Sequence, residues 1–128
     1  MDARQNLIDE LESTIASSEV HHRADVLRRI TDLFAAGSNG FSSEQVELFD
    51  DVMCRLVDEI EESARATFGQ RLADMGRTPK NLVRTLAFDD SIDVAGPLLS
   101  QCEQLDEATL VENAKTKSQD HLLAISRR

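Results

Sequence analysis

The sequence predicts an all-α protein, and three features indicate this fold class. Only two prolines and five glycines occur among the 128 residues, so long stretches lack the residues that interrupt helices. Apolar residues recur at spacings of three and four, which places them along one face of a helix. Ser, Thr or Asp precedes most of these stretches, where its side chain can cap a first helical turn. With five Phe and no Trp or Tyr, aliphatic side chains must supply most of the core.

Residues 1–76 are predicted to form a cap of three helices. The first covers residues 2–17, and its apolar stripe consists of Leu7, Ile8, Leu11 and Ile15. The second follows a possible cap at Ser17-Ser18 and ends at the segment Gly37-Ser38-Asn39-Gly40. Its expected buried residues are Val20, Ala24, Leu27, Ile30, Leu33 and Phe34.

The third helix is expected to be the longest element and to continue without a break to Gly76. Ser42 and Gln45 have the spacing of a capping box at its start. One apolar stripe then extends over about seven turns, through Val46, Phe49, Met53, Leu56, Ile60, Ala64, Phe68 and Leu72.

Residues 77–128 are predicted to form two hairpins of short helices. Thr78 can cap the first helix, with Pro79 as its first helical residue. The other three helices begin at possible caps, which are Asp89-Asp90-Ser91, Asp106 and Ser118. The core residues expected in the four helices are Leu82, Val83, Leu86 and Ala87, then Ile92, Val94, Ala95, Leu98 and Leu99, then Leu110, Val111 and Ala114, then Leu122, Leu123 and Ile125. Pro97 should lie inside the second of these helices and keep it short or bent, since proline cannot donate to the carbonyl four residues earlier.

The two hairpins resemble one another when the sequence is shifted by 28 residues. This shift places Leu82-Val83 on Leu110-Val111 and Val94-Ala95 on Leu122-Leu123. Repeated antiparallel hairpins, each covering one face of the next, are the units of helical solenoids.

Several segments resemble an uncharacterised bacterial family of helical proteins with HEAT-like repeats. They are LRRITDLF (27–34), EQVELFDDV (44–52), Asp89-Asp90 with Ile92, VAGPLL (94–99) and KSQDHLLAISRR (117–128). The resemblance implies a HEAT-like helical repeat fold in a bacterial cytoplasm, and it implies no activity. Because family members look longer, we expect the chain to be the amino-terminal part of a longer protein, or else to pair with itself through its end.

The net charge of −10 disfavours nucleic acid and anionic membrane surfaces as partners. The charge is uneven: residues 41–62 contain eight carboxylates and one basic residue, whereas residues 65–88 contain five basic residues and one carboxylate. Two solvated helix faces explain this distribution. The alternative is a regulatory domain that binds a ligand or nucleic acid through the basic segment 65–84, with Arg65, Arg71 and Arg84 as contacts.

No group of residues predicts a catalytic, cofactor or metal site. Glu19 and His22 form a single Glu-x-x-His pair, and the adjacent His21 must point about 100° away from His22 on a helix. The carboxylates at Asp50-Asp51 and Asp58-Glu59 lack the alternating ligands of a calcium loop. Two cysteines, Cys54 and Cys102, are too few for a disulfide framework. We therefore expect no enzyme activity and no bound metal or cofactor.

A cytoplasmic location is expected, because no secretory signal and no apolar run long enough to span a bilayer is visible. The expected role is a protein-interaction or scaffold module that binds a protein partner or a second copy. Leu122, Leu123 and Ile125 are the leading contact residues. With Ala124 they form a consecutive apolar run that sweeps about 300° of a helix, and one neighbouring hairpin cannot cover that arc.

Overall fold

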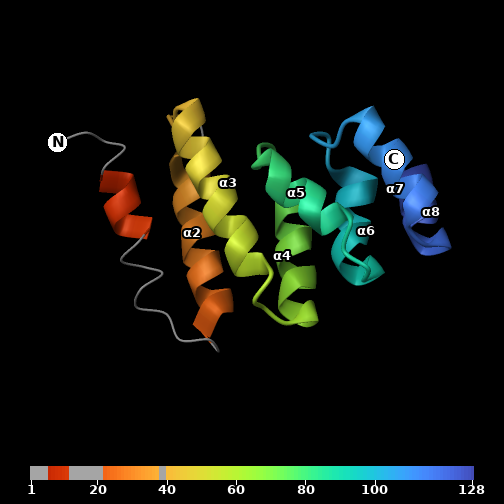
Figure 1. Ribbon diagram of the computed structural model, residues 1–128, viewed down its shortest axis with the longest axis horizontal. Coiled ribbons are helices and arrows are strands. Elements are labelled where there is room, and N and C mark those ends of the chain that lie inside the picture. The colour runs from red at the N-terminus through yellow and green to blue at the C-terminus, as the bar shows by residue number, and fades with distance from the viewer. Residues whose placement is uncertain (1–5, 12–21, 38–39) are drawn as a thin grey trace. The chain divides into compact units, whose positions relative to one another are not determined.

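The computed structural model describes residues 6–11, 22–37 and 40–128, and within these ranges every regular element is a helix (Figure 1). A short helix covers residues 6–11. It is followed by α2 (Arg23–Gly37), α3 (Ser43–Val57), α4 (Glu62–Asp74), α5 (Lys80–Ala87), α6 (Ile92–Gln101), α7 (Glu107–Thr116) and α8 (Gln119–Ser126). The all-α prediction is confirmed. The chain forms two compact units, Met1–Ile60 and Glu61–Arg128. The predictions at Ser17-Ser18, Glu19, Val20 and His21 lie outside the described residues.

The prediction of one continuous helix from residue 43 to Gly76 is wrong. Helix α3 ends at Val57, Asp58 is its C-cap, and Glu61 has extended backbone angles as the N-cap of α4. Ile60 and Phe68, two residues of the predicted stripe, are both buried. The carboxylates account for the break: negative charge opposes the carboxyl end of a helix dipole at Asp58, and it suits the amino end at Glu61.

The core of the Met1–Ile60 unit is built where α2 packs against α3. The ring of Phe49 lies 5.2 Å from Phe34 and 4.9 Å from Phe41, measured between ring centroids. The predicted capping box starts α3: Gln45 N–H donates to Ser42 Oγ, and Ser42 N–H donates to Gln45 Oε1 at 2.8 Å. This local signal therefore fixes where α3 begins.

In the Glu61–Arg128 unit, α4 packs against α6 and α6 packs against α8, while α5 and α7 lie against α6 and α8 respectively (Figure 1). Helices α4 and α6 approach closely at Gly69, where an added Cβ would lie 2.8 Å from the carbonyl oxygen of Val94. Pro97 lies inside α6, which is ten residues long, as predicted for a short helix around this proline.

Thr78 does not cap α5, contrary to the prediction. Pro79 occupies the N-cap position, and Thr78 is buried against Gln104, which follows α6. The Thr78 hydroxyl donates to Gln104 Oε1 at 2.6 Å, and Gln104 Nε2 donates to the Thr78 carbonyl at 2.9 Å. The side chain of Thr78 is therefore used to hold the start of the first hairpin to its end.

The two hairpins are related by 27 residues, one fewer than predicted. The N-caps Pro79 and Asp106 are 27 positions apart, as are Ser91 and Ser118. A one-residue error turns a helix by about 100°. It explains why the predicted core residues Val111, Leu122 and Leu123 are exposed. The buried positions of the second hairpin instead belong to Thr109, Asn113, His121 and Ala124.

Candidate functional site

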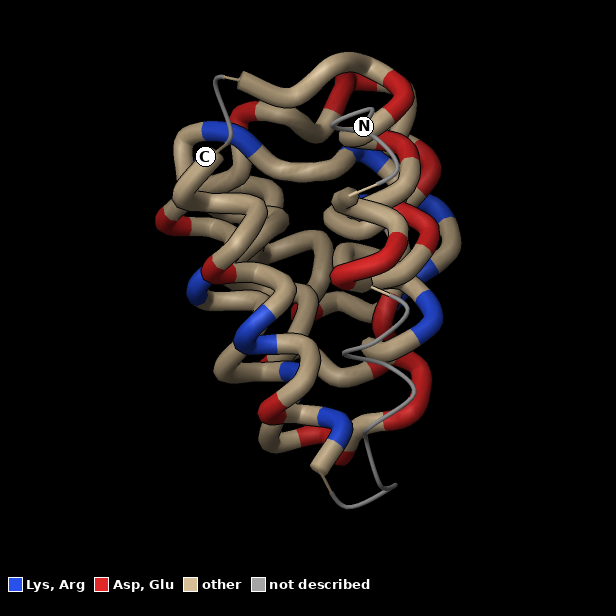
Figure 2. Tube along the Cα trace, turned by 90° about the vertical axis from the view of Figure 1, so that its left-hand side faces the viewer, with Lys and Arg blue, Asp and Glu red and all other residues tan. Residues whose placement is uncertain are grey.

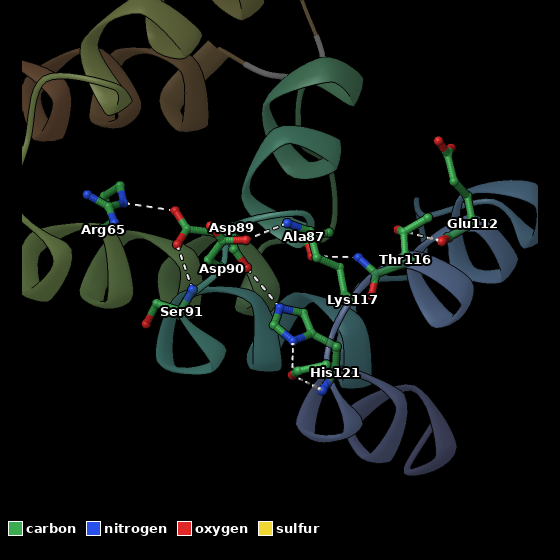
Figure 3. A network of polar contacts seen from close by, with 11 residues as sticks. Arg65, Ala87, Asp89, Asp90, Ser91, Glu112, Thr116, Lys117 and His121 are labelled. Carbon is green, nitrogen blue, oxygen red and sulfur yellow. Dashed lines mark hydrogen bonds and ion pairs between the residues drawn. The ribbon is translucent and has the colours of Figure 1, made fainter.

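Two buried polar side chains of the Glu61–Arg128 unit, Asn113 and His121, bind the α5–α6 corner, which we define as residues 87–91 (Figure 3). Side chains from α4, α7 and α8, and from the loop between α7 and α8, converge on this corner from sequence positions up to 32 residues away. The corner thus collects contacts from both hairpins and from the helix before them.

Asp89 is the acceptor at the centre of the corner. Its Oδ2 lies 2.9 Å from Arg65 Nε of α4, and its Oδ1 accepts from the main-chain N–H of Ser91 at 3.0 Å. Ser91 is the N-cap of α6, and the second bond gives its main-chain N–H an acceptor. The side chain of Ser91 itself makes no capping bond. Asp89 therefore caps the loop and pairs with α4 at the same time.

His121 connects α8 to the same residue through the main chain. The imidazole is 1% exposed, and its Nε2 lies 2.8 Å from the carbonyl oxygen of Asp89. Since a carbonyl can only accept, Nε2 carries the hydrogen. In the neutral ring, Nδ1 then accepts from the Ser118 hydroxyl, whose oxygen lies 2.7 Å away. Both ring nitrogens are used.

Asn113 of α7 supplies a further link to the corner. Its Nδ2 donates to the Ala87 carbonyl at 2.7 Å, so the end of α5 gains a partner from the next hairpin. Asn113 is fully buried, and its Oδ1 has no hydrogen-bond partner. The amide orientation follows from the bond to Ala87, because the reversed orientation would oppose two oxygens.

Two ion pairs join the hairpins at the surface. Lys117 Nζ lies 2.6 Å from Asp90 Oδ1, and Arg84 lies 2.8 Å from Glu112 Oε2. The hydrogen bond from Lys117, followed by its positive charge, holds the pKa of Asp90 below its usual value of 3.8. A side-chain hydrogen bond with Thr109 likewise lowers the pKa of Asp106, the predicted and observed cap of α7.

The polar contacts of the corner join α4, α7 and α8 to the α5–α6 loop. His121 meets the main-chain oxygen of Asp89 and not its carboxylate, which is occupied by Arg65. Ser118 is the N-cap of the helix that carries His121, so its hydroxyl is engaged at the helix start. Within the described ranges, no three His, Cys, Asp or Glu side chains are grouped so that they could hold a metal ion.

The arginines named as contacts in the basic segment 65–84 have different surroundings. Arg65 is paired with Asp89, and Arg71 is half-buried. Arg84 pairs with Glu112, and its guanidinium lies 5.2 Å from the centre of the Phe88 ring. Figure 2 shows Lys and Arg interspersed with Asp and Glu along the trace.

The apolar contact residues predicted on the last helix do reach the surface. Leu122 is 43% exposed and Leu123 is 50% exposed, whereas Ile125 is half-buried. Val111 of α7 is also exposed, and sequence reasoning had placed it in the core. It lines a shallow hollow along α7 with Glu107, Ala108, Glu112, Lys115 and Thr116, all from the same helix.

Comparison with known proteins gives one partial match. Residues 94–128 match an uncharacterised protein family that is conserved in bacteria (DUF2336). The matched range begins in α6 and includes α7 and α8, so it contains Asn113, Lys117 and His121. No curated protein and no solved structure matches the chain. In the described part of the chain, no helix has both the length and the apolar character needed to cross a membrane.

Proposed function

We propose that the chain is a non-enzymatic protein-interaction module, and that it binds its partner through the outer face of α8. The observation that carries this proposal is the difference between two equivalent residues. Ala95 of α6 is 0% exposed, whereas Leu122, 27 residues later on α8, is 43% exposed. The same position is covered in one hairpin and open in the next.

The packing of the helices supports a solenoid-like arrangement of the HEAT type as part of this proposal. Helix α6 is contacted by α4 and by α8, and α8 has its main contacts with α6 and α7. In a stacked array each hairpin covers the face of the preceding one. Leu122 and Leu123 are the large apolar side chains that α8 leaves exposed.

Burial of Leu122 and Leu123 by a partner would contribute to the free energy of binding. Each is about half exposed, and complete burial of a leucine side chain is worth roughly 1.5–3 kcal/mol. Burial of the remaining halves by a partner helix would therefore contribute on the order of 1 kcal/mol per leucine. A bacterial cytoplasmic setting, which the sequence resemblance implies, belongs to the same proposal.

The alternative, a regulatory domain that binds a ligand or nucleic acid through segment 65–84, has less support. Arg65 and Arg84, two of the three arginines named as contacts, are already paired with carboxylates, so an anion that binds them would have to displace Asp89 or Glu112. Such binding should weaken steeply with added salt, whereas binding through leucines should not.

The test is affinity capture from the native cell with three baits. The unchanged chain should capture a protein that the Leu122→Ser/Leu123→Ser variant loses. Val111→Ser is the matched control, because it removes an exposed apolar side chain from α7 and leaves α8 unchanged. Capture that is insensitive to the α8 change, or lost equally with the control, would exclude α8 as the binding face.

A further inference from the structure

The outer face of α8 carries a line of three residues with opposite charges at its ends. Asp120, Leu123 and Arg127 follow one another at spacings of three and four, so they lie along one side of the helix. All three are exposed. Neither Asp120 nor Arg127 forms an ion pair with a described residue.

The two charges cannot neutralise each other within one chain. They are seven positions apart, which is roughly 10 Å along a helix axis. An ion pair requires the charged atoms to lie within about 4 Å of one another. Gln119 and Ser126, which flank the line, are uncharged. The face is therefore apolar at its middle, negative at its amino end and positive at its carboxyl end.

Such a face is complementary to itself when two helices lie antiparallel. A two-fold axis midway between positions 120 and 127 passes half a residue from Leu123, so the two copies of Leu123 meet at the centre. The same axis places Asp120 of each copy opposite Arg127 of the other. Antiparallel helices also oppose their dipoles favourably. A parallel arrangement would bring like charges together instead.

From this complementarity we propose that the partner of the α8 face is a second copy of this chain, paired antiparallel through Asp120, Leu123 and Arg127. This inference rests on the proposed function, because it names the occupant of the same surface. The anchor of α8 is suited to such a role: the guanidinium of Arg128 donates to the carbonyls of Leu99 at 2.6 Å and Cys102 at 2.7 Å. These bonds fix the carboxyl end of α8 against α6.

The pairing should be weak and dependent on concentration. Helix α8 has eight residues and is therefore about 12 Å long, so the contact is smaller than a standard stable interface. The net charge of −10 on each copy also opposes association. We expect a dissociation constant on the order of 100 µM for the unchanged chain.

Sedimentation equilibrium of the purified chain, from about 10 µM to about 1 mM, tests the pairing directly. Asp120→Arg and Arg127→Asp should each weaken dimerisation by about tenfold or more, because each places like charges opposite each other twice. The double variant Asp120→Arg/Arg127→Asp should restore it. An equimolar mixture of the two single variants should also associate, since both ion pairs are re-formed between unlike chains.

A chain that stays monomeric at about 1 mM overturns the inference, as do single variants that dimerise as well as the unchanged chain. A mixture of the single variants that does not associate overturns the antiparallel geometry. Asp120 and Arg127 are both exposed, so each variant should fold like the unchanged chain. The helical circular dichroism spectrum of each variant checks this. If the chain is monomeric and yet the unchanged bait captures a different protein through Leu122 and Leu123, the self-pairing fails and the proposed function stands.

Discussion

His121 and Asp89 are joined by a hydrogen bond of 2.8 Å between the imidazole Nε2 of α8 and a main-chain carbonyl of the α5–α6 corner. The two residues are 32 positions apart, and the ring is almost completely buried. This bond ties the second hairpin to the first and so determines how α8 is presented.

Replacement of His121 by alanine should lower the free energy of unfolding by about 2–3 kcal/mol, because it leaves a buried cavity and an unpaired Asp89 carbonyl. Urea denaturation followed by circular dichroism measures the change. Gln119→Ala, on the exposed side of the same helix, is the control and should change the stability little. An equal effect of the two substitutions would contradict the role of His121.

Arg65 and Asp89 should show an energetic coupling of about 1 kcal/mol in a double-mutant cycle, since the pair is partly buried and solvent screens it only in part. The cycle compares Arg65→Met, Asp89→Asn and the double variant by urea denaturation. If the changes in the free energy of unfolding of the two single variants add up to that of the double variant, Arg65 and Asp89 are not energetically coupled.

Gly69→Ala should destabilise the chain by about 1–3 kcal/mol, although alanine is the better helix former, because the new Cβ would meet the Val94 carbonyl at 2.8 Å. Gly96→Ala is the matched control, since its nearest neighbour, Ile92 Cδ1, is 3.7 Å away. Thermal unfolding of both variants measures the change in stability, which should be larger for Gly69→Ala. A Gly69→Ala protein as stable as the control would mean that α4 and α6 do not require this close approach.

Lys117→Met should raise the pKa of Asp90 back towards 3.8, which carbon NMR of the carboxyl group can measure. Because the folded-state pKa is lowered, the pair stabilises the fold above the unfolded-state pKa, and this contribution is lost as the pH falls through the lowered value. The stabilities of the variant and the unchanged chain should therefore converge in acid. A pKa of Asp90 that is the same in both proteins would exclude the pairing.

The sequence was sufficient for the features that depend on neighbouring residues alone. The caps at Ser42, Asp106 and Ser118 follow from short local spacings, and all three form in the structure. The interruption at residues 58–61 was missed because apolar spacing continues through it. Charge at the helix ends was the signal that could have revealed it.

The register of the second hairpin could not be obtained from periodicity, since its core contains polar side chains. Thr109, Asn113 and His121 are buried there. Asn113 and His121 are tolerated because carbonyls of the first hairpin accept their hydrogens, a relationship between residues 26 and 32 positions apart. Apolar counting therefore favoured Val111, Leu122 and Leu123, and it placed in the core the same leucines that form the exposed face.

The most direct test of the α8 surface is a concentration series of amide NMR spectra of the purified chain, from about 50 µM to about 1 mM. Self-pairing through α8 predicts that the shifts which move with concentration belong to Gln119–Ser126 and Arg127, while those of segment 65–84 stay fixed. Spectra that do not change over this range, or changes centred on Arg65, Arg71 and Arg84, would contradict it.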